Sequence, residues 1–290
     1  MSNHFHTPSQ IVDLNIQSGV AKTNITWSKL ILLGILAGVC IAFGAQGSSV
    51  AMHGVANVGL SRLVGGVVFP VGLMMIVFTG GELFTGDCLL FMNVLDRKVK
   101  VSTMMKKLVA VYASNLIGAL LVAVLVYLSG QWDYSEGALG AFTIKVALGK
   151  TNLSFVSALA SGVLCNVMVC MAVLMAAAAK DIAGKVWAVF FPIMAFVVSG
   201  FEHCVANMYY IPAGIFAASH AEYVQKSEEL YGITDKALAG LNWGTFAVNN
   251  LIPVTLGNMI GGMLCVGGLF YVIHKNPKIN RFKNKEDISE

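Results

Sequence analysis

Charged residues are scarce in this chain. Asp, Glu, Lys and Arg make up only 12% of its 290 residues, whereas a soluble globular domain holds about 25%. Hydrophobic residues make up 57%, and the mean hydropathy is +0.74. This composition argues against a water-soluble enzyme or binding module. It predicts an all-α membrane protein that crosses the bilayer several times.

The sequence also lacks any motif for a metal or disulfide framework. Its first residues are polar, without the apolar core of a signal peptide, so we expect no cleavable secretion signal and expect the first span to act as its own insertion signal. None of the six cysteines forms a CxxC pair, and all lie in apolar runs, which is typical of small packing residues. We therefore expect no metal and no cofactor. The cysteines are Cys40, Cys88, Cys165, Cys170, Cys204 and Cys265.

Long apolar runs define six expected membrane spans, since about 20 apolar residues are needed to cross a bilayer. Residues 27–275 form the expected six-helix pore domain, residues 1–26 a cytoplasmic amphipathic segment on the membrane surface, and residues 276–290 a cytoplasmic charged tail. We interpret residues 130–152 and 219–243 as polar connections. The spans are expected at about 28–52, from about 64 to the end of the second run, 107–129, 153–179, 186–217 and 245–274.

The basic residues predict the orientation in the membrane. With both termini in the cytoplasm, fourteen of the 19 Lys and Arg residues fall on the cytoplasmic side, as the positive-inside rule requires. This distribution also explains the net charge of +4 without a nucleic-acid partner. We expect a bacterial cytoplasmic membrane protein with membrane lipids around it. The five residues on the other side are Arg62, Lys145, Lys150, Lys226 and Lys236.

The fifth run is interrupted near its middle by residues 200–207, which read Gly-Phe-Glu-His-Cys-Val-Ala-Asn. Glu202 and His203 each cost about 2.5–3.5 kcal/mol at this depth and therefore usually face a bundle interior or a water-lined path. We predict a broken helix at Gly200, with His203 facing a pore. A histidine satisfied between helices is the alternative.

The second run is interrupted in the same way by residues 79–87, which contain Gly80, Glu82 and Gly86. Phe-Pro precedes both interruptions, and Asn-x-Ile-Gly follows each of them downstream. This pattern predicts two three-helix repeats, at about 28–129 and 153–274, the second inverted in the membrane. Such repeats place a permeation site near the midplane, where the two broken helices meet.

Several other residues are candidates for the pathway. Glu82 and Glu202 are expected to accept backbone N–H bonds at the breaks, with a proton-relay role as the alternative. Asn166 is expected to cap freed backbone or to orient His203. Lys150 lies just before the fourth span, where a cation raises the local concentration of anions; a solvated loop lysine is the alternative. Phe69, Leu73, Leu83, Phe84 and Phe196 flank the breaks and are candidates for apolar constrictions, although ordinary helix packing gives the same pattern.

Four segments together resemble the signatures of the formate/nitrite transporter family, and the likeness extends over about residues 10–275. The second and third are centred on Asn166 and on His203. After Lys150 the chain reads Thr-Asn-Leu-Ser, where formate-conducting members often have a histidine pair, and by overall impression it is most similar to the hydrosulfide branch. The segments are residues 80–86, 162–172, 200–207 and 249–258.

The resemblance implies a homopentamer in which each protomer has an aquaporin-like six-helix fold and its own pore for small monovalent anions. It implies that His203 is the central pore histidine, with Asn166 near it and Thr85 hydrogen-bonded toward it, and that Asn207 belongs to the same site. Lys150 would attract the anion, and the N-terminal helix and the segment after Gly86 would take part in gating. The apolar candidates listed above would line two constrictions.

The sequence thus predicts a channel for hydrosulfide, formate or nitrite, and not an enzyme. A proton-coupled secondary transporter would use the same residues. An aquaporin-like channel for neutral solutes fits the fold but would usually carry Asn-Pro-Ala pairs, which this sequence lacks. A haem-binding subunit would need facing histidines, and only His203 lies in mid-span. A purely structural membrane protein would not need Glu202 and His203 at membrane depth.

Overall fold

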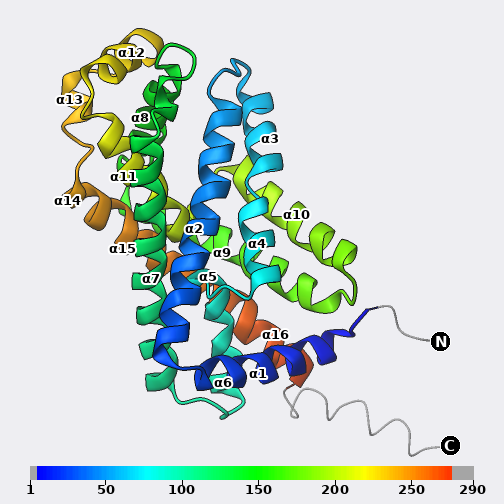
Figure 1. The fold of residues 1–290 in the computed structure, drawn as a ribbon. Helices are drawn as coiled ribbons and strands as arrows, with labels where there is room; N and C mark the ends of the chain where they lie inside the picture. The colour runs from blue at the N-terminus through cyan, green and yellow to red at the C-terminus, as the bar shows by residue number, and fades with distance from the viewer. Residues whose placement is uncertain (1–4, 276–290) are drawn as a thin grey trace, which may run out of the picture.

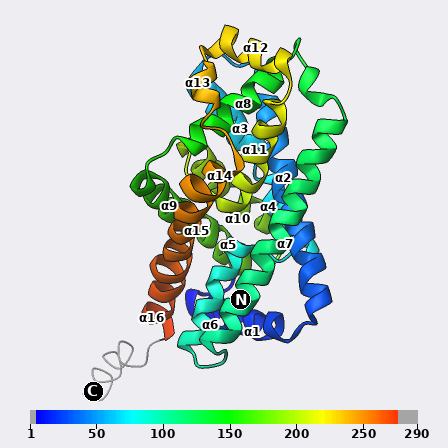
Figure 2. The same cartoon turned by 90° about the vertical axis from the view of Figure 1, so that its left-hand side faces the viewer.

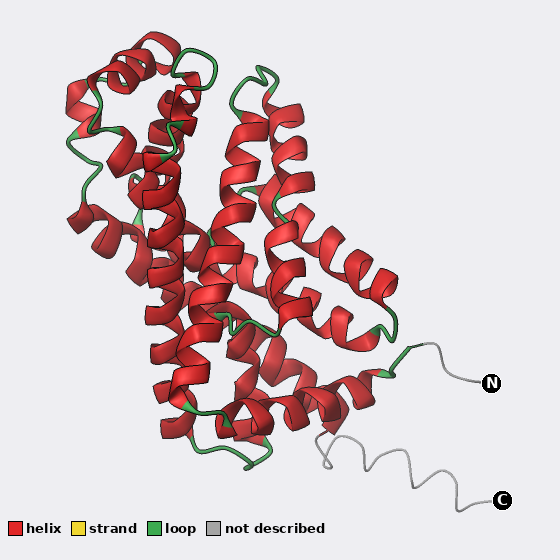
Figure 3. Ribbon diagram, viewed as in Figure 1, coloured by secondary structure: helices red, strands yellow, loops and turns green. Residues whose placement is uncertain are grey.

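A computed structural model describes residues 5–275. Over this range the secondary structure is helical, apart from one isolated bridge between Phe5 and Ala179 (Figure 3). The predicted charged tail, residues 276–290, lies outside the described residues.

The first half of the chain runs from the N-terminal helix to the third span. Its elements are α1 (Pro8–Asn24), α2 (Trp27–Met52), α3 (Val58–Val68), α4 (Val71–Thr79), α5 (Phe84–Asp87), the 3-10 turn η1 (Cys88–Leu90), α6 (Phe91–Leu95) and α7 (Val101–Leu128).

The second half follows a short turn. Its elements are η2 (Gln131–Asp133), α8 (Ala138–Thr151), α9 (Phe155–Ala178), α10 (Ile182–Ser199), α11 (Cys204–Ala217), α12 (Ala221–Tyr231), α13 (Asp235–Leu238), α14 (Trp243–Thr245), the π-helical η3 (Phe246–Leu251), α15 (Ile252–Met259), the π-helical η4 (Ile260–Gly268) and α16 (Leu269–Lys275).

Six helical stretches in the described range are long and apolar enough to cross a membrane, which confirms the predicted number. The second begins at Val58, earlier than the predicted start near Val64. Ser61 and Arg62 lower the hydropathy there, but the Ser61 hydroxyl donates to the carbonyl of Met52 at 3.3 Å, and Asn57 caps the helix. The stretches are Trp27–Met52, Val58–Thr79, Val101–Leu128, Phe155–Ala178, Ile182–Ser199 and Trp243–Lys275.

The long helices lie side by side in a bundle, and different helices lie at its two ends. At one end, α1 lies across the bundle; at the opposite end, α12 and α13 cover it (Figure 1). The view turned by 90° shows the same arrangement (Figure 2). We call these ends the α1 face and the α12 face.

Both predicted helix breaks are present. Helix α4 ends at Gly80 with φ +75°, and α10 ends at Gly200 with φ +73°. These left-handed conformations favour glycine. After three more residues in each case, the chain turns into a second helix, α5 or α11.

One asparagine fastens each break through the same three hydrogen bonds. The amide of Asn115 donates to the carbonyls of Gly34 and Glu82 and accepts from the N–H of Phe84 at 3.0 Å. Asn258 repeats this pattern with Gly162, Glu202 and Cys204, accepting from the last at 2.9 Å. Backbone groups freed inside the membrane need such partners.

Small residues let the helices that carry these asparagines approach their neighbours. A Cβ on Gly38 of α2 would lie 2.1 Å from the carbonyl oxygen of Asn115 in α7. A Cβ on Gly257 of α15 would lie 2.2 Å from that of Leu159 in α9. Close backbone contact at small residues is the usual way in which membrane helices associate. The two halves therefore share their packing as well as their breaks, as predicted for a duplicated chain.

The prediction of a polar loop at residues 130–152 is wrong. Helix α8 occupies most of it, and its Leu139, Ile144 and Ala147 are fully buried. The two lysines of this segment suggested a solvated loop, but they lie on a helix that packs against α11. The predicted polar connection at residues 219–243 contains two short helices, α12 and α13.

Helix α8 stands before α9 as α1 stands before α2. Lys22 lies twelve residues before Gly34, and Lys150 lies twelve residues before Gly162. Each lysine is in the last turn of its helix. The correspondence between the halves therefore extends to α1 and α8, beyond the predicted repeat limits.

Candidate functional site

His203 is the N-cap residue of α11, directly after the break, and it is 2% exposed. Its Nδ1 accepts a hydrogen bond from the N–H of Ala206 at 3.0 Å, and its Nε2 lies 2.8 Å from Oγ1 of Thr85. Because Nδ1 accepts, the hydrogen bonds assign the proton to Nε2. In this arrangement the imidazole is neutral and donates toward the threonine hydroxyl.

Thr85 comes from the other break, in α5, and is fully buried. Its carbonyl accepts from Nδ2 of Asn166 at 3.2 Å and from Sγ of Cys170 at 3.4 Å. Asn166 also donates to the carbonyl of Asn258 at 2.6 Å. Of the two roles expected for Asn166, capping of freed backbone fits these bonds.

The residue that corresponds to His203 in the first half is Leu83. It is the N-cap of α5, with φ −109° and ψ 123°, close to the −113° and 115° of His203. Glu82 and Glu202 precede them at equivalent positions. The backbone scaffold is thus repeated, but a polar side chain caps only the second helix.

Glu202 holds a buried polar network toward the α12 face. Its Oε1 accepts from Nζ of Lys150 at 2.9 Å, and its Oε2 accepts from Asn207 at 2.6 Å and from Asn250 at 3.2 Å. Asn250 also donates to the carbonyl of Lys150 at 3.0 Å. Lys150, predicted as an isolated cation, is therefore joined to the break.

Glu82 holds the equivalent contact on the α1 face. Nζ of Lys22 lies 3.0 Å from Oε2 of Glu82 and 2.5 Å from Oδ1 of Asp87. Partial burial opposes the charged form of this lysine, but the carboxylates of Asp87 and Glu82 outweigh it and raise the pKa of Lys22 above its usual range. Helix α1 is thereby fastened to the first break.

The candidate constriction residues fall into two groups. Phe69 and Phe196 meet edge to face, with ring centroids 5.5 Å apart, and the Phe196 ring lies 6.1 Å from that of His203. Leu73 and Leu83 form the second group and line a cavity beside α1. Phe84 packs edge-on against Tyr112, with centroids 4.9 Å apart, so its ring has a packing partner as well.

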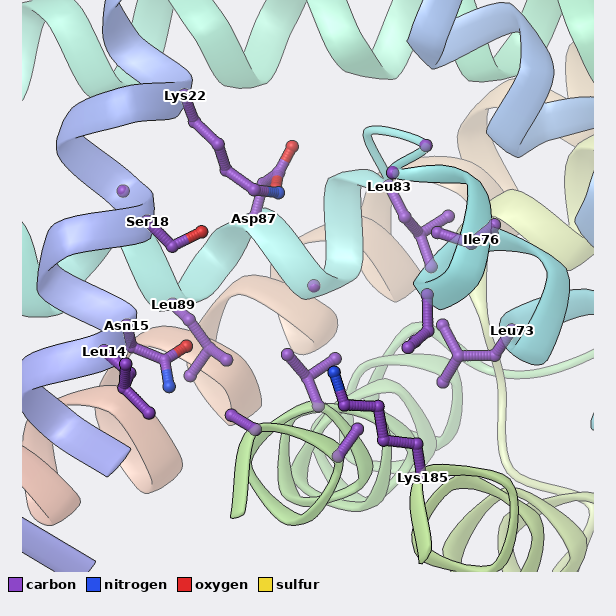
Figure 4. A pocket seen from close by; sticks show the side chains of 18 of the residues that line it. Leu14, Asn15, Ser18, Lys22, Leu73, Ile76, Leu83, Asp87, Leu89 and Lys185 are labelled. Carbon is purple, nitrogen blue, oxygen red and sulfur yellow. The ribbon is translucent and has the colours of Figure 1, made fainter. Parts of the chain in front are cut away.

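A cavity of about 630 Å³ lies between α1 and the first break. Lys22 and Asp87 point toward one another at one side of it, and Lys185 extends into it from the other (Figure 4). Leu73 and Leu83 line it, whereas Thr85 and His203 do not. The central pair of Thr85 and His203 is therefore not part of the lining of this cavity.

Some residues of the site were not predicted. Asn115 and Asn258 served only as markers of the repeat, although a buried asparagine beside a broken helix is a strong sign of backbone capping. Asn250 belonged to a motif without a role. Lys22 could have been found from its spacing to Gly34, once Lys150 was chosen. Asp87 gave no signal apart from its depth in the membrane.

Comparison with known proteins identifies the family. The family model described as "Formate/nitrite transporter" matches residues 9–272. The chain belongs to this family. It is 37% identical to a "Probable formate transporter" of Methanothermobacter thermautotrophicus, over 93% of this chain and 98% of that protein. It is 37% identical to "Formate channel FocA" of Haemophilus influenzae, over 90% of this chain and 92% of that protein.

Solved structures of the family have the same fold. A "Pentameric formate channel with formate bound" matches with a TM-score of 0.76 and 34% identity, over 86% of this chain and 97% of that one. An "FNT family ion channel" matches with a TM-score of 0.77 over 91% of this chain and 98% of that one; at 24% identity this match concerns the fold alone. Family membership confirms the resemblance drawn from the four motifs and the predicted membrane-spanning, six-helix architecture.

Proposed function

We propose that this protein is a channel for small monovalent anions of weak acids, with formate as the first candidate. The named relatives support formate, because they are formate channels or transporters at 37% identity over most of the chain. Nitrite and hydrosulfide are of similar size and charge and are candidates of the same class. The relatives and the paired donor at His203 and Thr85 carry this proposal together.

The observation that carries the mechanism is the neutral hydrogen-bond pair at the centre. His203 and Thr85 each come from a different break and meet at 2.8 Å. Both can turn a hydrogen toward an anion, and neither adds a full charge that would trap it. In a site of low dielectric such donors interact strongly with a negative ion.

The apolar rings pose the main barrier. A bare charge is expensive beside Phe69 and Phe196, whereas the neutral acid is not. Proton transfer from the neutral imidazole would leave an imidazolate, which is far more basic than formate. His203 could lend a proton only as an imidazolium, and that requires Nδ1 to release the N–H of Ala206. We therefore propose hydrogen-bond donation as its primary role. Protonation of the anion is a second step, in which Nδ1 first takes a proton from water on the pathway and the resulting imidazolium then passes one proton to the anion and returns to the neutral form.

Lys150 is proposed to raise the anion concentration at the α12 face. It lies in the last turn of α8, with its side chain 16% exposed, and is paired with Glu202, the residue directly before His203. A cation at a pathway mouth attracts anions and increases the rate at which they arrive.

The test is flux into liposomes that contain the purified protein. Formate, nitrite, hydrosulfide and chloride are compared at equal concentration and pH. We expect formate and at least one of the other weak-acid anions to cross at least ten times faster than chloride, the anion of a strong acid. Chloride flux equal to that of formate, or no formate flux, would contradict the proposal.

A proton-coupled transporter is the second candidate, and the apolar contact of Phe69 with Phe196 favours it. A barrier that rejects bare charge couples the anion to a proton. An imposed pH gradient without a formate gradient separates the two: coupled transport accumulates formate, and single-channel currents in planar bilayers mark a channel. Water flux in the same liposomes tests the remaining aquaporin-like alternative.

We further propose that five copies assemble and that the α1 face is cytoplasmic in a bacterial inner membrane. The related solved channel is titled as a pentamer, and the basic residues favour this orientation. Light scattering in detergent gives the number of copies. Labelling of a cysteine at position 17, in whole and in opened cells, gives the orientation.

A further inference from the structure

The ammonium group of Lys150 has a second partner besides Glu202. Its Nζ lies 5.1 Å from the centroid of the Tyr210 ring, within the range of a cation–π contact. We propose that Tyr210 is a positioning residue, whose ring face holds the Lys150 ammonium at the mouth of the pathway. The proposal rests on the function proposed above and concerns how the anion is attracted.

The position of Tyr210 on α11 supports this role. His203, Asn207 and Tyr210 are spaced by four and three residues, which places them on one stripe of the helix. Asn207 donates to the carboxylate of Glu202, and Tyr210 faces its cation partner, Lys150. Residues of this stripe therefore contact both members of the ion pair, in the first turns of the helix after the central histidine.

An aromatic ring differs from a carboxylate in what it does to an approaching anion. The ring attracts the cation through its quadrupole but has no net charge. It can therefore fix the ammonium without cancelling its attraction for anions at longer range. Lys22 shows the opposite arrangement, because its ammonium lies between the carboxylates of Glu82 and Asp87.

Without the ring, the Lys150 ammonium would keep its contact with Glu202 and lose its contact with Tyr210. We expect the ammonium to stay closer to that carboxylate, and the anion to be drawn in less strongly. The apparent KM for formate should rise about fivefold, the size of a typical cation–π contribution. The maximal flux should change less than twofold, since His203 and Thr85 are untouched.

A graded substitution tests this without a large change in shape. Tyr210→Phe is the reference, and phenylalanines with one, two, three and five fluorine atoms at position 210 weaken the quadrupole stepwise. We expect KM to rise with each step in formate flux assays. The matched control is the same series at Tyr231, whose ring lies 4.2 Å from Nζ of Lys145; it should leave KM unchanged.

The outcomes separate the two proposals. A KM that stays constant through the series, with normal folding, overturns the role of Tyr210 and leaves the channel function intact. A decline in maximal flux or yield alone marks a packing role and also overturns it. Absence of formate flux in the unmodified protein overturns the channel function first. If Tyr210→Phe does not fold, ring-fluorinated tyrosines at position 210 replace the series, and a constant KM again overturns the proposal.

Discussion

The two breaks have the same scaffold and differ in the residue that caps the second helix. Asn115 and Asn258 make matching hydrogen bonds at each break, yet the N-cap is Leu83 in one half and His203 in the other. The scaffold solves the problem of freed backbone twice. The polar chemistry is added once, so only one half supplies the imidazole at the centre.

The two lysine clusters differ in the same way. With all groups ionised, Lys22, Glu82 and Asp87 carry a formal charge of −1, whereas Lys150 and Glu202 sum to zero. Among the residues described, the α1 face thus uses its lysine to hold a helix. The α12 face keeps its lysine beside a ring, where it can still attract an anion.

Making the two N-caps alike should have the largest effect on transport. His203→Leu gives the second break the residue of the first and removes the central donor. We expect formate flux in liposomes to fall about a hundredfold, in line with the loss of a hydrogen bond to a charged group. Leu108→Met, a conservative change at a buried residue of α7, is the control and should stay within twofold of the unmodified protein. Equal flux in the histidine variant would remove His203 from the mechanism.

Removal of the two asparagines tests whether the scaffold is truly equivalent. Asn115→Ala and Asn258→Ala each leave two carbonyls and one N–H without their partner, in a fully buried place. Each should lower the unfolding temperature in detergent by about 5 °C or more. Ser129→Ala, at the end of α7, is the control. If one asparagine variant is destabilised and the other is not, the halves are not held in the same way.

Replacement of the two lysines by methionine should have different effects. Lys150→Met should raise the KM for anion uptake from the α12 face about tenfold, because the attracting charge is lost. Lys22→Met should instead release α1, since Glu82 and Asp87 lose their cation. A spin label on Gln17→Cys, in a Cys265→Ala background, measures this as increased mobility. Similar transport defects and an unchanged label in both variants would argue against separate roles.

The charge that Lys22 contributes to the attachment of α1 should be insensitive to pH across the physiological range. The pKa of Lys22 is raised in the folded protein, so its contribution is fully present below the usual lysine value of about 10.4. It is lost only as the pH rises through the still higher folded value. Because its partner Asp87 is itself titratable, the label at position 17 is followed in an Asp87→Asn background, where it should keep the same mobility between pH 6 and 9. A transition that Lys22→Met abolishes within this range would contradict the assignment.

The smallest effect is expected from balancing the charge of the two clusters. Asp87→Asn keeps an oxygen for Lys22 to donate to, but it brings the formal charge of the α1-face cluster to zero. Formate uptake from that face should then show a KM about twofold lower, as befits a partly exposed ion pair. Asp96→Asn, farther along the same segment, is the control. A higher KM would mean that Asp87 aids the anion instead of hindering it.

Local sequence predicted much of this molecule. The lengths of the apolar runs predicted six spans. The ionisable residues beside Gly80 and Gly200 predicted both helix breaks and the position of His203. Helix α8 was missed, because residues 130–137 before it are polar and its 14 residues are too few to cross a bilayer, so the whole stretch was assigned to a connection. The pairing of Lys22 with Glu82 joins residues 60 positions apart, and no local pattern predicts such a contact.

The match between α1 and α8 has a consequence for the origin of the chain. Lys22 and Lys150 are separated by the same number of residues as Gly34 and Gly162, so the repeated unit is longer than three helices and includes its own leading helix. Because the two copies run in opposite directions, an origin by duplication requires a single-copy ancestor that could insert into the bilayer both ways and pair with itself.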